Sequence, residues 1–173
     1  QYQQRPLLPP VKRVPHDRPY NEQSALVLSQ WVVDTLTQQH AQIAVIARMG
    51  KPRIRRFDWT GMTHSGFAYF DSTTQHWTVI NLFSDAPETP ETFHLWQTSL
   101  YDFYYAQAGK ETNALILIPP PALQNALIEG FTSGKHQQLL PDNGYSYIAP
   151  VEKLARFNCN KWIILNMLAA TLQ

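Results

Sequence analysis

The sequence predicts an α+β protein: a small antiparallel sheet packed against helices that lie on one side of it. Three observations support this fold class. The 173 residues are 44% hydrophobic and 16% charged, a balance that can bury one substantial core. Two aromatic-rich segments, 63–70 and 76–83, flank a polar turn and are typical of a β-hairpin. Apolar residues at three- and four-residue spacings elsewhere predict helices.

The N-terminal segment differs in composition from the rest of the chain. Five of its first twenty residues are proline, which breaks regular helix and favours an extended arm. We therefore expect an arm over 1–22 and a single domain over 23–173. Because the chain begins with Gln1 rather than Met, we also expect an exported protein, periplasmic or secreted, whose signal peptide has been removed.

The first half of the domain contains a helix, a strand and the hairpin. Ser24 can cap the helix, and four apolar residues form a stripe along it. These residues are Leu28, Trp31, Val32 and Leu36. The apolar run 43–47 predicts a buried strand, and it is followed by a basic loop over 51–56. The hairpin comes next in the chain.

In the second half, aromatic residues at helical spacing predict a helix over 92–106. A strand over 115–118 cannot continue into the three prolines that follow it, and the last of these can begin a helix that ends at Gly130. The segment 133–147 has the composition of a loop. A long apolar helix over 157–172 closes the chain.

Composition and charge exclude several classes of function. A net charge of +1 gives no electrostatic footprint for nucleic acid. No segment approaches the roughly 18 apolar residues of a membrane span. A single cysteine excludes an internal disulfide framework and cysteine-based metal clusters, and no organic cofactor or metal is implied.

That single cysteine, Cys159, stands where the last helical pattern begins. If Asn158 caps the helix, the unpaired amides and the positive end of the helix dipole would stabilise a thiolate. The same amides could hold an oxyanion after the sulfur attacks a carbonyl. The alternative is an inert cysteine packed in the core, which is the commoner role of an isolated thiol.

A cysteine nucleophile needs a base, and His64 is the best placed of the six histidines. It begins the first hairpin strand and shares a face with Gly66 and Ala68, whose small size would admit the N-terminus of the Cys159 helix. Asn81 on the partner strand could orient the imidazole if it lies opposite His64, a register that also pairs Tyr69 with His76. Asn81 could equally be a polar residue that bonds a loop at the strand end.

The order of these motifs resembles that of the circularly permuted NlpC-type papain-like superfamily, which includes lecithin retinol acyltransferase-like enzymes. The motifs are the histidine strand that begins His64-Ser65-Gly66-Phe67 and the helix start Asn158-Cys159-Asn160-Lys161-Trp162. More closely, 25–172 resembles the bacterial domain of unknown function 2145 family, through the segments 47–50, 63–68 and 77–83 and the Asn-Cys pair at 158–159. The superfamily usually has histidine where this chain has Asn81.

The resemblance implies a cysteine hydrolase, amidase or acyltransferase that acts on an amide or ester, for example in a cell-wall peptide. Cys159 would be the nucleophile, His64 the general base and acid, and Asn81 the orienting residue. The rival hypothesis is a non-catalytic binding module whose groove is lined by four aromatic residues: Trp59, Trp77, Trp96 and Tyr104. A metal site built on His64 and His76 ranks last, since Asp71 is the only carboxylate near them.

Overall fold

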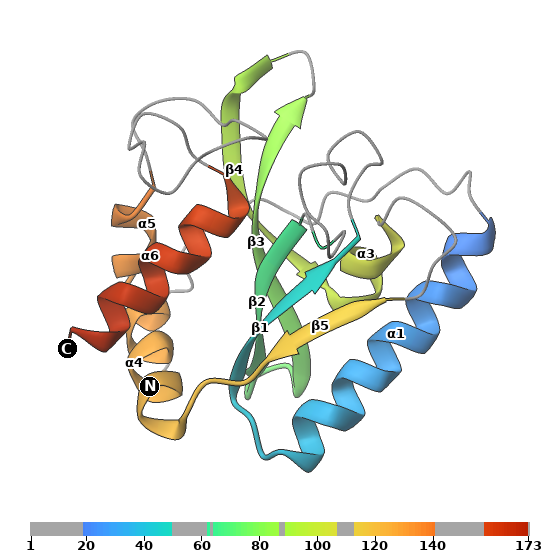
Figure 1. The fold of residues 1–173 in the computed structure, drawn as a ribbon, viewed down its shortest axis with the longest axis horizontal. Coiled ribbons are helices and arrows are strands. Elements are labelled where there is room, and N and C mark those ends of the chain that lie inside the picture. The colour runs from blue at the N-terminus through green and yellow to red at the C-terminus, as the bar shows by residue number, and fades with distance from the viewer. Residues whose placement is uncertain are drawn as a thin grey trace.

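The structure is a computed structural model that describes residues 19–49, 62, 64–86, 89–106, 113–140 and 158–172. Its described strands form one five-stranded antiparallel sheet in the order β4-β3-β2-β1-β5 (Figure 1). The strands are β1 (Ile43–Arg48), β2 (His64–Asp71), β3 (His76–Ala86), β4 (Thr89–Ser99) and β5 (Ala114–Leu117). The predicted α+β class is therefore confirmed.

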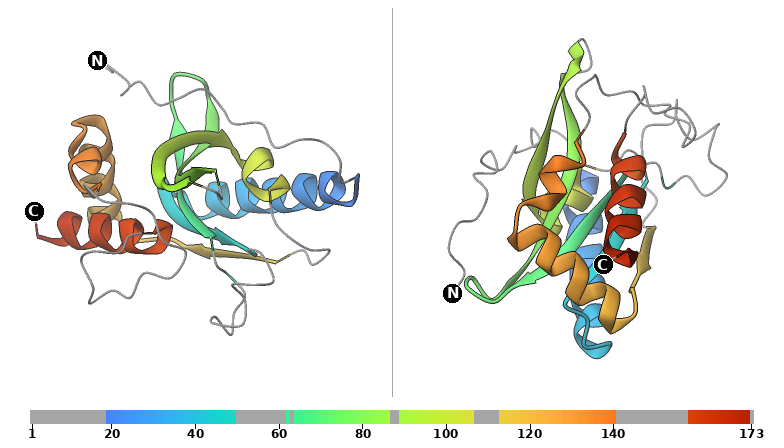
Figure 2. Two further views of the ribbon diagram at one scale, coloured as in Figure 1. Left: turned by 90° about the horizontal axis from the view of Figure 1, so that it is seen from above. Right: turned by 90° about the vertical axis from the view of Figure 1, so that its left-hand side faces the viewer.

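Helices cover both faces of the sheet, so the expectation that they lie on one side is wrong. The described helices are α1 (Pro19–Gln38), α3 (Leu100–Tyr105), α4 (Pro121–Thr132), α5 (Lys135–Gln138) and α6 (Cys159–Thr171). α1 and α3 lie against one face, and α4, α5 and α6 lie on the other side of the sheet (Figure 2). The physical reason is that β1 and the start of β2 are almost continuously buried, which requires cover on both sides.

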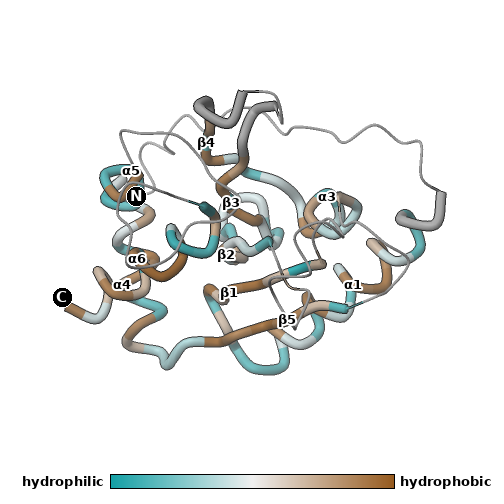
Figure 3. Tube along the Cα trace, turned by 45° about the horizontal axis from the view of Figure 1, so that its top comes forward, coloured by the Kyte–Doolittle hydropathy of each residue, from teal (hydrophilic) through white to brown (hydrophobic). Residues whose placement is uncertain are grey.

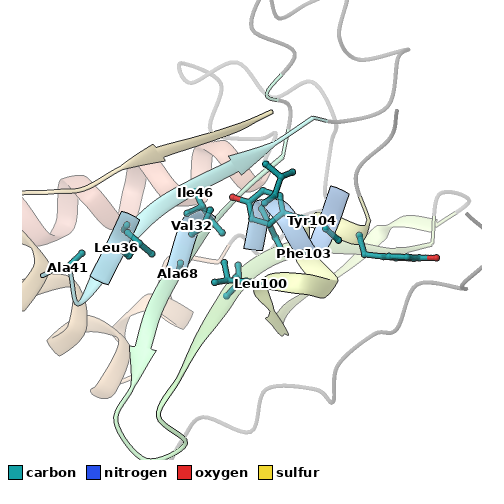
Figure 4. Packing of buried hydrophobic residues seen from close by; sticks show 13 residues of the cluster. Val32, Leu36, Ala41, Ile46, Ala68, Leu100, Phe103 and Tyr104 are labelled. Carbon is teal, nitrogen blue, oxygen red and sulfur yellow. The ribbon is translucent and has the colours of Figure 1, made fainter. Parts of the chain in front are cut away.

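Alternation along the strands divides the core into two clusters. In β2, Phe67 packs with residues of α4 and α6, whereas the next residue, Ala68, packs with residues of α1 and α3. Figure 4 shows residues of α1, β1, β2 and α3 meeting in the cluster that contains Ala68. Hydrophobic stretches of β1 and β5 lie between the two layers of helices (Figure 3). The sheet therefore separates two distinct interiors.

The segment 92–106, predicted to be one helix, is divided between strand β4 and the short helix α3. Pairing with β3 decides this, since Asn81 faces Trp96 and Leu82 faces Leu95 across the two strands. Leu95 packs toward α6, while the next buried residue, Thr98, faces the α3 side. Phe93 and Trp96 fit a helical stripe, but in β4 their spacing of three places them on opposite faces, so the pairing with β3 overrides the helical pattern.

The first helix differs from the predicted one in where it begins and in which of its residues are buried. α1 begins at Pro19, inside the expected arm, so Ser24 lies within the helix and does not cap it. Trp31 is 48% exposed and leaves the predicted stripe, whereas Leu28, Val32 and Leu36 are buried. Residues 1–18, which make up most of the expected arm, lie outside the described residues, as do 50–61 with the basic loop.

Candidate active site

The histidine strand and its partner bring His64 and Asn81 together. The Nε2 atom of His64 lies 3.1 Å from Oδ1 of Asn81, and both side chains are buried. The register differs from the expected one by two residues, because Asn81 faces Gly66 and His76 faces Asp71. The expected pairs of His64 with Asn81 and of Tyr69 with His76 are therefore wrong. A shift of two residues leaves every side chain on the same face, so the imidazole and the amide still meet diagonally.

Two further hydrogen bonds determine how the Asn81 amide is oriented. Its Nδ2 donates to the carbonyl oxygen of Trp96 over 3.2 Å and to Oγ1 of Thr98 over 3.3 Å. A carbonyl oxygen can only accept, so the oxygen of the amide faces His64. His64 must then carry its proton on Nε2 and donate it to Asn81. In the neutral imidazole, Nδ1 is left with the lone pair.

The surroundings of His64 favour this neutral form. Its ring stacks on Phe83 with 4.3 Å between centroids and lies 5.6 Å from the ring of Phe103. On the neighbouring strand β1, Arg48 is paired directly with His64. Burial of His64 and then the positive charge of Arg48 lower the pKa of the imidazole well below its usual 6.5, against a smaller opposite effect of the Asn81 hydrogen bond. At pH 7, His64 is therefore neutral, and its Nδ1 is the atom that can accept a proton.

Cys159 has the helix position that the sequence predicts. Asn158 is the N-cap of α6, and its Oδ1 accepts a hydrogen bond from the backbone nitrogen of Lys161 over 2.9 Å. The thiol is 1% exposed, and its Sγ lies 3.6 Å from Oδ1 of the adjacent Asn160. Ser65 donates to that same oxygen over 2.6 Å and so fixes the start of α6 on the start of β2.

The structure nevertheless does not bring Cys159 to His64. Cys159 packs in the cluster that contains Phe67, on the α6 face of the sheet. His64 alternates with Ser65 and Phe67 along β2 and lies against Phe103 of α3, on the other face. The expectation that the Cys159 helix packs on the His64 face is wrong, and the backbone of β2 separates the thiol from the imidazole.

The small residues beside His64 serve a different purpose from the one expected. A Cβ added to Gly66 would come within 2.9 Å of the Ile80 carbonyl oxygen and 3.0 Å of the Asn81 Cβ. Ala68 contributes to the cluster with α1 and α3. Gly66 therefore permits a close approach of β3, which carries Asn81, rather than the approach of α6.

The four aromatic residues of the rival groove do not line one surface. Tyr104 is fully buried in the core beside α1, whereas Trp77 packs on Phe70 toward the hairpin end of the sheet. Trp96 is half-buried on β4, and Trp59 lies outside the described residues. A single groove lined by the three described members is therefore not formed.

The two histidines of the metal hypothesis lie at opposite ends of β2. His64 begins the strand, and His76 faces its last residue, Asp71. Seven steps along the strand separate these two positions by on the order of 20 Å, which is far beyond the span of one metal ion. Within the described segments, no group of three or more His, Cys, Asp or Glu side chains could hold a metal.

Two buried polar residues of the site were not identified from the sequence. Arg48 is 5% exposed and lies in phase with the buried Ala44 and Ile46 of β1, so its position on a buried face could have been noticed from the period of two. Thr98 was hidden because its segment was predicted to be helical. It supplies an acceptor that orients Asn81.

Fold and site together define an α+β protein with a buried, neutral histidine held by an asparagine on the adjacent strand. The chain belongs to the family described as "Uncharacterized protein conserved in bacteria (DUF2145)", whose model matches residues 35–173. This confirms the closer of the two resemblances, while the relationship to NlpC-type enzymes stays a prediction. No curated protein and no solved structure matches the chain. Within the described helices, no stretch has the length and apolar character needed to cross a membrane.

Proposed function

We propose that the protein hydrolyses an ester or amide, with His64 as the general base and Asn81 as the residue that positions it. One observation carries this proposal: Nε2 of His64 lies 3.1 Å from Oδ1 of Asn81, an arrangement in which the imidazole carries its proton on Nε2. Among the described residues, Nδ1 has no hydrogen-bond partner, and it is the atom that would accept a proton. An imidazole kept neutral by burial and by Arg48 is available as a base at pH 7.

The nucleophile in this proposal is a water molecule rather than Cys159. Nδ1 of His64 removes a proton from the water as its oxygen bonds to the carbonyl carbon of the substrate. The tetrahedral intermediate then expels the alcohol or amine, which takes the proton back from the imidazolium. Cys159 has no part in these steps because it packs on the opposite face of the sheet. An exported location and a cell-wall peptide substrate stay predictions.

The test is hydrolysis of a panel of p-nitrophenyl esters and peptide anilides by the purified protein. We expect His64→Ala to lower kcat/KM at least about 100-fold, as removal of a general base does. Asn81→Ala should lower kcat more than it raises KM, because it disturbs the orientation of the base. The acid limb of the wild-type pH profile should lie below pH 6.5, since the pKa of His64 is lowered.

Two controls separate this proposal from its rivals. His76→Ala removes an exposed histidine at the far end of the hairpin and should leave the rate unchanged. Cys159→Ala should also retain the wild-type rate of hydrolysis. If hydrolysis is lost in Cys159→Ala, the result would instead support the cysteine mechanism. If no substrate is hydrolysed faster by the wild type than by His64→Ala, the hydrolase is rejected and a binding module remains.

A further inference from the structure

The sheet has two edge strands, and they differ in composition. β4 at one edge contains Pro90, Glu91 and His94, and its pairing with β3 has a register shift. Proline, charge and irregular pairing all hinder the addition of another strand to an edge. β5 at the other edge has the sequence Ala-Leu-Ile-Leu, and no charged residue occurs over 112–128. The edge of β5 therefore lacks the charge and proline that protect β4.

The backbone groups at the centre of β5 point away from the sheet. Just before β1, the carbonyl oxygen of Gln42 accepts a hydrogen bond from the backbone nitrogen of Phe70 over 2.9 Å. Hydrogen-bonded pairs alternate along an antiparallel ladder, so the odd-numbered residues of β1 bond to β5. They face Leu115 and Leu117, which leaves the N–H and C=O of Ile116 on the outer edge. Among the described residues, no strand pairs with that edge.

The side chains of β5 alternate between the two faces of the sheet. Ile116 packs with the cluster of α1 and α3, whereas Leu115 and Leu117 point to the face that α4 and α6 cover. Those two helices lie over β1, β2 and β3 and cover β5 only partly. Leu115 is therefore 43% exposed and Leu117 48% exposed. Two apolar side chains are thus accessible beside an unpaired backbone edge.

We propose that β5 pairs with the β5 strand of a second copy of this chain, so that the two sheets join into one. A two-fold axis would pass between the two Ile116 residues, which exchange both of their outward N–H···O hydrogen bonds. In this antiparallel register, Leu115 of each copy lies opposite Leu117 of the other. The exposed leucines then cover each other, and the unpaired backbone groups gain partners. The pairing does not depend on the proposed hydrolase function.

Charge favours a second copy as the occupant of this edge. A two-fold axis brings each edge residue close to its own counterpart, so a charged side chain there would repel itself. The uncharged edge of β5 avoids this repulsion, and a net charge of +1 adds little repulsion between whole molecules. The proline-rich segment 1–18 of the same chain is a poorer occupant, since its prolines lack the N–H that strand pairing needs.

Sedimentation velocity of the full chain tests this association. A strand of four residues offers less area than the roughly 800 Å² per copy of a standard interface, so we expect a weak dimer with a micromolar Kd. The mass should rise from monomer to dimer between about 1 μM and about 300 μM. A protein that stays monomeric over this range overturns the proposal.

Two matched variants locate the contact. Leu117→Lys places a charge on the β5 edge and should weaken the dimer at least about ten-fold. Leu168→Lys places the same charge on α6, at a leucine that is 53% exposed, and should associate as the wild type does. Equal effects of the two substitutions, whether both weaken the dimer or neither does, overturn the pairing through β5.

Cysteine variants test the register without an added charge. Leu115→Cys alone or Leu117→Cys alone does not place two cysteines directly opposite each other, whereas an equal mixture of the two does. Under mild oxidation we expect the mixture to form a disulfide-linked dimer at least about ten-fold faster than either variant alone. Leu168→Cys gives the rate of random collisions, and Cys159 is 1% exposed in all of these proteins. A mixture no faster than Leu168→Cys contradicts the register.

Hydrogen exchange followed by NMR distinguishes a second copy from a segment of the same chain. The amide of Ile116 should exchange rapidly in dilute protein and slowly in concentrated protein. The amides of Leu115 and Leu117 bond to β1 and should be protected at both concentrations. Protection of Ile116 at every concentration would mean that the same chain covers the edge, and it would overturn the proposal, as would rapid exchange throughout. None of these measurements involves hydrolysis, so this proposal and the hydrolase can fail separately.

Discussion

At the scale of single residues, Asn81 determines the chemistry of His64 through bonds to other partners. Its amide nitrogen is occupied by Trp96 and Thr98, so only its oxygen is left for the imidazole. Gly66 makes this arrangement possible, since it lets β3 approach β2 closely beside Asn81. The tautomer of His64 is thus decided by residues of three strands, β2, β3 and β4.

Cys159 gives a prediction at the same scale. Because its thiol is 1% exposed and lies across the sheet from His64, we expect iodoacetamide to label the native protein slowly. The rate should be the same in His64→Ala at every pH tested. Mass spectrometry of the alkylated protein measures both rates, and labelling in urea provides the control for a fully reactive thiol.

The opposite result would restore the cysteine mechanism. Rapid labelling of the native protein at neutral pH that disappears in His64→Ala would mean that the thiol and the imidazole communicate. The structure would then need a rearrangement that moves α6 to the His64 face.

At the scale of elements, α6 depends on the residues that begin it. Asn158 caps the helix, and the side chain of Asn160 attaches it to Ser65 of β2. Further along, Trp162 is fully buried against Phe67, and its Nε1 donates to the carbonyl oxygen of His136. The first turn of α6 therefore connects the sheet with α5.

Removal of the cap should destabilise the protein without changing the sheet. We expect Asn158→Ala to lower the free energy of unfolding by about 1 kcal/mol, because the backbone nitrogen of Lys161 loses its acceptor. Urea denaturation followed by circular dichroism measures this change. Asn125→Ala, an exposed asparagine within α4, is the matched control and should cost little or nothing. Equal effects of the two substitutions would show that Asn158 does not act as a cap.

At the scale of the whole molecule, each interior contains one buried histidine with a lowered pKa. His64 lies on the α3 side, and His136 lies under Phe131 between α4 and α6. Burial is the main cause in both cases, and it is partly offset at His136 by the carbonyl oxygen of Gly130. Both clusters are therefore sensitive to protonation.

The stability of the protein should fall as the pH is lowered through about 6.5. There the unfolded chain takes up protons on these histidines while the folded chain does not, so the unfolded state is favoured. Between about pH 7.5 and about pH 5, urea midpoints should fall less in His136→Gln than in the wild type. His76→Gln changes an exposed histidine and should retain the wild-type pH dependence. A wild-type dependence in His136→Gln as well would contradict the assignment.

Much of the fold follows from local sequence signals, and the exceptions have a common cause. The hairpin, β1, β5, α4 and α6 all lie close to where their patterns predict them. The segment 92–106 does not, because its aromatic residues have a helical spacing and pairing of its first part with β3 overrides that local pattern. The register of the hairpin was wrong by two residues for a similar reason, since both registers bury the same faces.

The sequence by itself determined the α+β class and the capped start of α6, because alternation and capping depend on residues near one another in the chain. The face that Asn81 shares with His64 depends on the register of the hairpin, which the structure decided. Only the tertiary structure decided which helices cover which face. That choice separates Cys159 from His64 and places Arg48 and Tyr104 near the imidazole. The path of the chain between elements decides which face of the sheet each helix covers. No local sequence pattern indicates on which side of a sheet a distant helix will pack.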